Sequence, residues 1–165
     1  MPEAPVPMVH FRLATPEDCR RIWEWRNEPA TRESSFDNKI IPYEDHERWF
    51  LSKMQDPGIR IFIAMNEENL DIGYVRFNIS AADAEISISV DKDQRGQGIG
   101  SATIQGASDQ ILSSDAANRV IAYVKDDNPA SLKAFRRAGF STTQTKEMAG
   151  VLAHEMVYEG ALAKA

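Results

Sequence analysis

The segment Gln94–Gly100, QRGQGIG, sets three glycines at alternate positions behind an arginine. It lies between an alternating segment that ends at Val90 and a segment with helical periodicity that begins near Gly98. The first turn of a helix has unpaired N–H groups and partial positive charge, which favour anions. Glycine permits a close backbone approach and positive φ, and Arg95 adds forked donors. From these residues alone, the loop is either a phosphate cradle or a plain strand-to-helix turn.

Two well-known phosphate-binding motifs do not fit this loop. No Gly-Lys-Ser/Thr follows it, which excludes a Walker loop. The glycine spacing is wrong for the dinucleotide fingerprint, and we expect no parallel βαβ unit around the loop.

Apolar periodicity on both sides of the loop predicts an α/β (α+β) fold. The expected strands cover about 9–13, 60–65, 71–79, 84–90, 119–124, 140–145 and 151–158. The expected helices cover about 16–27, 43–54, 98–112 and 128–138, and the polar stretch 30–42 is assigned no element. This order predicts a single mixed, mostly antiparallel sheet of about seven strands flanked by helices.

Composition limits the class of protein. The chain has 165 residues, which fits one domain over 1–165, with a loose leader at 1–8 and a tail at 160–165. The formal net charge of -6 argues against nucleic-acid binding and is compatible with an amine substrate. The single cysteine, Cys19, excludes an internal disulfide. No segment reads as a membrane span or a signal peptide, so we expect a cytoplasmic protein, and no metal.

A second motif changes the interpretation of the loop. Asn128–Phe140, NPASLKAFRRAGF, begins just after the strand expected at 119–124. The two motifs at this spacing closely resemble the GNAT superfamily of acyl-CoA-dependent N-acyltransferases. Its loop has the form Arg/Gln-x-x-Gly-x-Gly/Ala, and its later helix opens with Asn and ends at Gly-Phe, as at Gly139-Phe140 here. The resemblance covers the whole chain in element order and is sharpest over 84–140.

The resemblance implies acetyl-CoA as co-substrate. The loop amides would bind the coenzyme A pyrophosphate, and pantetheine would lie where strands 84–90 and 119–124 splay apart. The implied cofactor-binding residues are Ser89, Val90, Gln94, Arg95, Gly96, Gln97, Gly98, Ile99, Gly100, Ser101, Asn128, Ser131 and Phe135. Dimers are common in the resembled family, so a homodimer is one expectation, although the sequence leaves the oligomeric state open.

The implied reaction is direct attack of an amine on the thioester, and a group must take the amine's proton. Glu85 is the first candidate, acting through water from the strand that flanks the thioester. It is equally interpreted as a solvent-facing strand glutamate. His46 and Asp45 are second candidates, against the alternative that they are surface residues.

One position departs from the resembled family. Many members carry a tyrosine where this chain has Phe135, and that tyrosine is proposed to protonate the leaving thiolate. Tyr123, on the preceding strand, is a substitute candidate. A thiolate is also a tolerable leaving group without help. Cys19 is interpreted as a packing residue rather than as the site of an acyl-enzyme.

The N-terminal half would shape the acceptor site. The segments WRNEP and HERWF look like those of two branches, the amino-sugar N-acetyltransferases that act on nucleotide-linked 4-amino sugars and the ribosomal-protein N-terminal acetyltransferases. Aromatic and polar side chains there could bind the acceptor, and these are Trp25, Arg26, Asn27, Tyr43 and Trp49. The same aromatic residues at helical spacing also fit a core. A third hypothesis, a coenzyme A-binding regulator without chemistry, depends on Phe135.

Overall fold

The computed structural model describes residues 7–160 and contains one seven-stranded sheet in the order β1-β2-β3-β4-β5-β7-β6. The strands are β1 His10–Leu13, β2 Ile59–Met65, β3 Asp71–Ser80, β4 Asp83–Val90, β5 Arg119–Lys125, β6 Ser141–Met148 and β7 Val151–Tyr158. The α-helices are α1 Cys19–Asn27, α2 Pro29–Ser34, α3 Tyr43–Met54, α4 Ile99–Ser113 and α5 Pro129–Arg137. Two short 3-10 turns, η1 Pro16–Asp18 and η2 Lys92–Gln94, lie before α1 and α4.

The predicted fold class is confirmed. All strand pairs in the described residues are antiparallel except β4 with β5. Because these two parallel strands are joined through α4, the glycine loop does lie in a parallel βαβ unit, and the expectation that no such unit surrounds it is wrong. The predicted leader at 1–8 and tail at 160–165 fall almost wholly outside the described residues. None of the helices in the described part of the chain is long and apolar enough to cross a membrane.

Helix α2 was not expected, because Pro29 reads from the sequence as the end of the preceding helix. Here it starts a new helix instead, since a proline at the first helical position needs no N–H partner. The Glu28 side chain caps α2 by accepting a hydrogen bond from the Thr31 amide at 3.2 Å.

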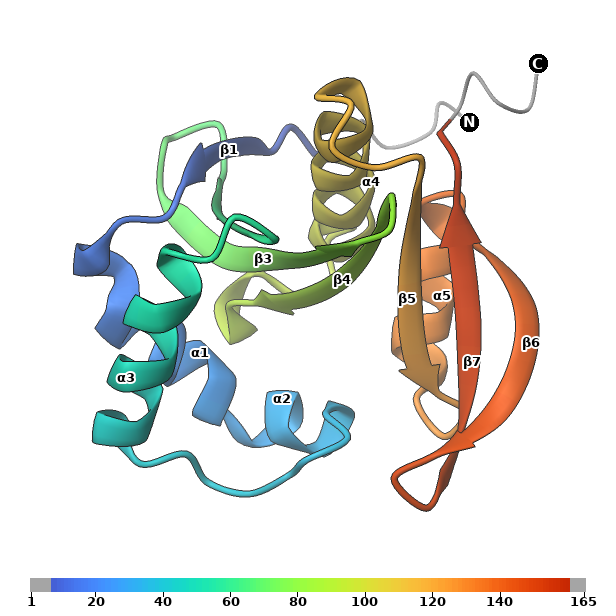
Figure 1. The fold of residues 1–165 in the computed structure, drawn as a ribbon, viewed down its shortest axis with the longest axis horizontal. Coiled ribbons are helices and arrows are strands. Elements are labelled where there is room, and N and C mark those ends of the chain that lie inside the picture. Colours follow the sequence, from blue (N-terminus) through green and yellow to red (C-terminus); the bar gives the residue numbers. More distant parts are fainter. Residues whose placement is uncertain (1–6, 161–165) are drawn as a thin grey trace.

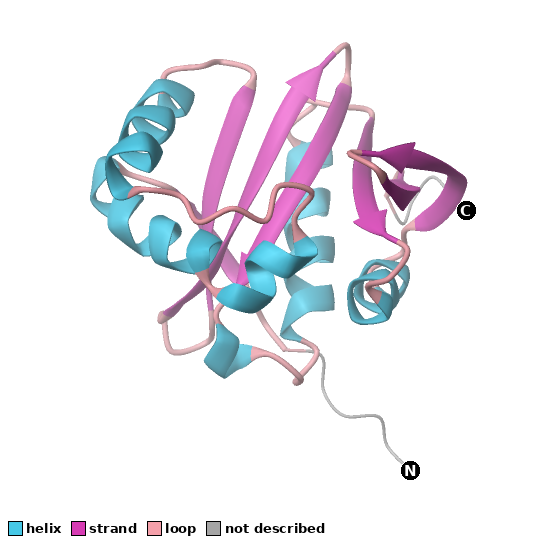
Figure 2. Cartoon of the chain, turned by 90° about the horizontal axis from the view of Figure 1, so that it is seen from below, coloured by secondary structure: helices cyan, strands magenta, loops and turns pink. Residues whose placement is uncertain are grey.

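Helices cover both faces of the sheet, as Figures 1 and 2 show. On one face α4 and α5 pack on β3, β4 and β5 through residues such as Ile104, Leu132 and Phe77. On the other face α1 and α3 pack on β2 and β3, with Ile22 and Phe50 fully buried.

The sheet divides between β4 and β5. Their parallel ladder pairs only Asp83–Glu85 with Arg119–Ile121. In Figure 1 the two strands diverge beyond these pairs, with β5, β7 and β6 on one side and β1 to β4 on the other. The predicted splay of strands 84–90 and 119–124 is therefore present, and it opens a gap inside the sheet.

His46 joins α3 to α1. Its side chain is completely buried, with Nε2 2.8 Å from the Cys19 carbonyl oxygen and Nδ1 3.1 Å from Arg26 Nη1. Because arginine only donates, Nδ1 must accept and Nε2–H must donate, so the imidazole is neutral. Burial is the main cause that lowers the pKa of His46. The sequence interpretations of His46, as a base or as a surface residue, are both wrong, because its one lone pair is occupied inside the core.

We expect His46 to make the protein less stable in mild acid. Its folded-state pKa lies below the unfolded value of ~6.5, so the unfolded chain binds a proton that the native protein does not. The free energy of unfolding should therefore fall as pH drops below ~6.5, with a slope of up to about 1.4 kcal/mol per pH unit. Urea titrations between pH 7.5 and 5.5 measure this slope.

His46→Gln should flatten the pH dependence, because glutamine can accept from Arg26 and donate to Cys19 without titrating. His10→Gln is the matched control, since His10 is exposed on β1. Equal slopes in the wild type and His46→Gln would contradict this account.

Candidate active site

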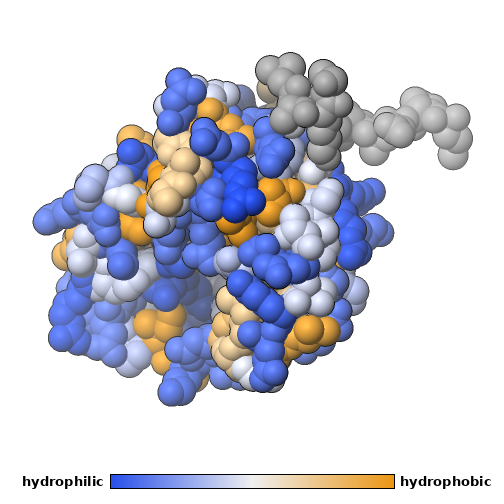
Figure 3. All heavy atoms as spheres, turned by 45° about the vertical axis from the view of Figure 1, so that its right-hand side comes forward, coloured by the Kyte–Doolittle hydropathy of each residue, from blue (hydrophilic) through white to orange (hydrophobic). Residues whose placement is uncertain are grey.

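A cleft of about 920 Å³ occupies the gap between β4 and β5. It is lined by residues of β3, β4, β5, α2, α4 and α5, and by the loop that follows α2. Figure 3 shows the molecule with its β5–β7 side turned forward, where hydrophilic residues surround a recess in the surface. The predicted site residues that line the cleft are Arg26, Glu85, Ser89, Val90, Arg95, Gly96, Gly98, Gly100, Ser101, Tyr123, Asn128, Ser131 and Phe135.

The glycine loop forms one end of the cleft. Gly96 and Gly98 have φ values of +83° and +79°, the left-handed region that glycine adopts without strain. Ala102 is the residue whose amide donates to the Gly98 carbonyl, so the amides of residues 99–101 precede the helical hydrogen-bond pattern. These amides and the positive end of α4 can hold a phosphate.

Three predicted cofactor residues do not line the cleft. Gln94 ends the η2 turn, and Gln97 lies outside the cleft lining. The Ile99 side chain is buried against Ala64 and Ile72. Its part in anion binding is limited to its backbone amide.

Arg95 ties the loop to the start of α2. Its Nη2 lies 2.9 Å from Glu28 Oε2 and 3.2 Å from Thr31 Oγ1, and its Nε donates to the Val90 carbonyl at 3.1 Å. Although burial opposes it, these hydrogen bonds from Arg95 and Thr31 lower the pKa of Glu28. The charge of Arg95 is therefore already balanced by Glu28, and its N–H groups hydrogen-bond both the Val90 carbonyl and the residues around the start of α2.

Of the candidate bases, Glu85 is the one that lies in the cleft. On β4 it shares a face with Ser87 and Ser89, opposite the core residues Ala84 and Ile86. Asp45 lies on the exposed face of α3, where it forms an ion pair with Arg48, and it does not line the cleft. His46 is buried behind the acceptor side, as described above.

Tyr123 also lines the cleft, from β5. Its hydroxyl donates to Glu155 Oε1 at 3.3 Å. Burial first, and then the nearby carboxylates Glu155 and Glu85, raise the pKa of Tyr123. The phenol is therefore protonated at neutral pH and can donate a proton.

The end of the cleft beside α5 is formed by residues of the motif that begins at Asn128. The Asn128 Oδ1 caps α5 by accepting from the Ser131 amide at 3.2 Å, while its Nδ2 donates to Ser34 Oγ at 3.1 Å. Phe135 is buried, edge-to-face with Phe140. It offers the cleft an apolar surface and no proton.

Of the predicted acceptor residues, only Arg26 lines the cleft. Trp25 stacks on Tyr74, and Asn27 hydrogen-bonds the Ile41 backbone. Tyr43 and Trp49 pack partly buried in the cluster around α1 and α3. Their positions match the core interpretation. Cys19 is buried beside them, and burial is the main cause that raises the pKa of its thiol, which fits a packing role.

The sequence interpretation missed Tyr74 and Arg76, which line the cleft from β3. Both lie on the face opposite the core residues Val75 and Phe77. An arginine within an apolar strand was the available signal, but it did not reveal which elements would cover that face.

The cleft is strongly cationic. Of the described residues, seven basic side chains and two carboxylates line it, and these are Arg26, Arg32, Lys39, Arg76, Arg95, Lys133, Arg137, Asp37 and Glu85. Phosphates are therefore favoured there despite the negative net charge of the chain. The described residues include no cluster of three or more His, Cys, Asp or Glu side chains that could hold a metal.

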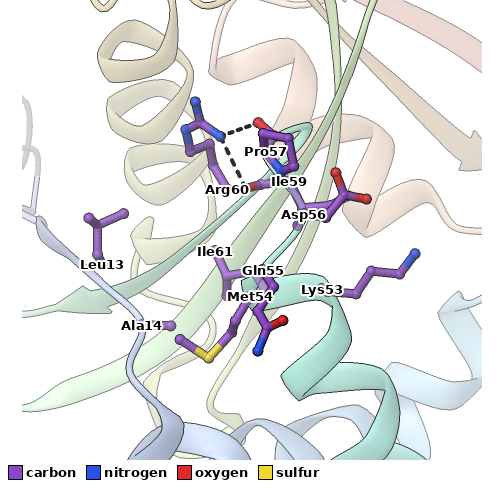
Figure 4. A pocket seen from close by; sticks show the side chains of 10 residues that line it. All are labelled: Leu13, Ala14, Lys53, Met54, Gln55, Asp56, Pro57, Ile59, Arg60 and Ile61. Atoms are coloured by element: carbon purple, nitrogen blue, oxygen red, sulfur yellow. Dashed lines mark hydrogen bonds between the residues drawn. The ribbon is translucent and has the colours of Figure 1, made fainter.

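A second pocket, of about 280 Å³, lies where α3 ends and β2 begins (Figure 4). Lys53 and Arg60 are its cationic side chains, and Arg60 donates to the backbone carbonyls of Pro57 and Ile59. It contains none of the predicted site residues. The larger cleft is therefore the candidate active site.

Comparison with known proteins agrees with this geometry. The relative acetyltransferase PseH of Campylobacter jejuni is 26% identical over 138 residues, which cover 82% of this chain and 85% of that protein. The solved structure of AAC(6′)-Ib with ribostamycin and coenzyme A superposes with a TM-score of 0.83 at 19% identity, covering 94% of this chain and 95% of that one. Spermidine N-acetyltransferase from Vibrio cholerae, with coenzyme A and spermine, gives a TM-score of 0.81 at 18% identity, with 91% and 94% covered.

The family assignment rests on a match to a family model. Residues 9–141 match the family model of the acetyltransferase (GNAT) domain, which spans both the glycine loop and the segment that starts at Asn128. The chain therefore belongs to the GNAT family of acetyl-CoA-dependent N-acetyltransferases.

Proposed function

We propose that this enzyme acetylates the primary amine of a small acceptor by direct attack, and that a nucleotide-linked amino sugar is the favoured acceptor. The observation that carries this proposal is the cleft itself. It joins the glycine loop, the separated strands β4 and β5, and Glu85 in one continuous cavity. The excess of basic side chains in the cleft, which suits the phosphates of such an acceptor, supports this choice. The WRNEP and HERWF segments are compatible with it, and equally with the ribosomal-protein N-terminal acetyltransferases.

Acetyl-CoA supplies the thioester that the amine attacks. The amides at residues 99–101 and the left-handed glycines would bind its pyrophosphate, and the cationic residues of α5 would favour its one remaining phosphate. The edge of β4 beyond Glu85 is left without β5 as a partner. Its backbone groups would pair with pantetheine, and an N–H there would stabilise the oxyanion that forms on the thioester oxygen.

Glu85 would remove the proton from the acceptor. An alkylammonium near the lysine reference pKa of ~10.4 is mostly protonated at neutral pH, so a carboxylate in the cleft assists its deprotonation. Tyr123 would then protonate the leaving thiolate in place of the tyrosine that Phe135 replaces. Its hydroxyl is protonated at neutral pH, because burial and the nearby carboxylates raise the pKa of Tyr123.

An acceptor panel tests the function. With acetyl-CoA as donor, thiol release should be fastest with nucleotide-linked amino sugars and slower with polyamines and with peptides that have free N-termini. Mass spectrometry of the product identifies the acetylated amine. A folded protein that binds acetyl-CoA but releases no thiol with any acceptor would favour a non-catalytic regulator, and preference for peptides would favour a protein N-terminal acetyltransferase.

Gly98→Val should abolish acetyl-CoA binding in calorimetry. A side chain at this position would project where the pyrophosphate must approach, and its Cβ meets only Pro7 at 3.7 Å in the protein itself. Gly150→Val is the matched control, because Gly150 has a similar φ of +81° and open space around its Cβ, in the β6–β7 hairpin. Both substitutions carry the same kind of backbone strain. Unchanged affinity in Gly98→Val, or equal loss in both variants, would contradict the loop assignment.

Glu85→Gln should lower kcat by about 100-fold, the range typical of a lost general base, with acetyl-CoA affinity unchanged. The dependence of kcat/KM on pH should differ between this variant and the wild type. Tyr123→Phe should instead change the high-pH limb. A wild-type pH–rate profile in Glu85→Gln would assign the base to another group.

A further inference from the structure

Two arginines on the acceptor side of the cleft have no carboxylate partner. Arg26, on α1, and Arg76, on β3, both line the cleft, and neither forms an ion pair with any described residue. The other cleft arginine with a defined role, Arg95, is paired with Glu28 at 2.9 Å. The pair therefore brings two uncompensated charges to one place.

The surroundings hold both guanidinium groups in place. The Arg26 Cζ lies 4.2 Å from the centroid of the Trp49 ring, and the Arg76 Cζ lies 5.0 Å from the same centroid. Arg26 donates to His46 Nδ1, and Arg76 donates to Ser87 Oγ at 3.2 Å. These partners are neutral, so they orient the two side chains without balancing their charge.

The burial of this pair calls for an anion. Both residues are partly buried, and the Arg76 Nε atom is fully buried without a hydrogen-bond partner in the described structure. Burial, and to a smaller degree the charge of Arg76, lower the pKa of Arg26, which means that its surroundings disfavour the charge of Arg26. Buried charges are normally paired, and forked guanidinium donors match phosphate or carboxylate oxygens.

We propose that Arg26 and Arg76 form a binding site for an anionic group, phosphate or carboxylate, that the acceptor carries beside its amine. This inference rests on the proposed N-acetyltransferase function and specifies its substrate class. In the β3–β4 register Arg76 lies opposite Ser87, two residues from Glu85. The strand rise places these two β4 positions about 7 Å apart, so the anion and the amine are held at neighbouring points of one acceptor.

The same site disfavours polycationic acceptors. Spermine and ribostamycin, which are bound in structures similar to this one, carry several amines and no anionic group. Two unpaired guanidinium groups would repel such molecules. The negative net charge of the chain, which taken alone suggests a cationic substrate, is therefore misleading about the acceptor site.

Calorimetry with inorganic diphosphate and with succinate tests the site. The protein is first saturated with coenzyme A, so that the pyrophosphate loop is filled, and the titration is made at low salt because screening weakens such contacts. We expect one further anion to bind. In Arg26→Gln and Arg76→Gln the dissociation constant should rise about tenfold or more, since each loses charge-assisted hydrogen bonds.

Arg48→Gln is the matched control and should bind the anion as the wild type does, because Arg48 is an exposed arginine on α3, away from the cleft. Arg76→Lys keeps the charge and should retain part of the affinity, which separates lost binding from lost folding. Tighter binding of diphosphate identifies a phosphate site, and tighter binding of succinate a carboxylate site. Binding of neither anion, or equal binding by all variants, would overturn the proposal.

A kinetic comparison separates this inference from the proposed function. The ratio of kcat/KM for glucosamine 1-phosphate to that for glucosamine should be well above one and should fall about tenfold in Arg76→Gln. Efficient acetylation of spermine together with absent anion binding would leave the N-acetyltransferase function standing and remove the anion site. Anion binding without acetylation of any amine would leave the anion site standing and contradict the N-acetyltransferase function.

Discussion

The site depends on one constraint, the early end of hydrogen bonding between β4 and β5. Three residue pairs join the strands, and beyond Glu85 they separate. Every other part of the cleft is arranged around that separation. The glycine loop lies between β4 and α4, and a short connection joins β5 to α5, so the N-termini of both helices line the cleft. A continuous ladder would leave no gap for the cleft to occupy.

The separated halves are held by contacts across the mouth of the cleft. Lys125 Nζ on β5 donates to the Glu33 carbonyl of α2, and Asn128 Nδ2 donates to Ser34 Oγ. On the other wall, Thr31 Oγ1 lies 3.3 Å from Ser89 Oγ. Helix α2 is therefore fastened to both walls at once. Because it spans only six residues, its position comes from these contacts and from its Glu28 cap rather than from its own helical stability.

The parts of the site that sequence predicted are those fixed by local chemistry. The glycine requirement at positions 96 and 98 follows from positive φ, and the helix that begins after Asn128 is predicted from its own sequence. The parts that sequence did not predict depend on distant partners. His46 is buried where its Nε2–H donates to the Cys19 carbonyl and its Nδ1 accepts from Arg26, and nothing within α3 indicates these two distant partners. Likewise, the alternation along β3 predicts on which face of the sheet Arg76 lies, but it does not predict that the Trp49 ring of α3 packs against it.

The buried histidine and the cleft arginines belong to one arrangement. His46 Nδ1 accepts from Arg26, and that bond requires the imidazole to be neutral, so the histidine adds no third positive charge beside the guanidinium pair. The Trp49 ring supplies a negative π face against which both arginines lie. A neutral histidine and an aromatic ring tolerate two like charges without neutralising them, whereas a carboxylate at either place would fill the role that we assign to the acceptor. The acceptor side of this enzyme is thus built to leave positive charge uncompensated until a substrate arrives.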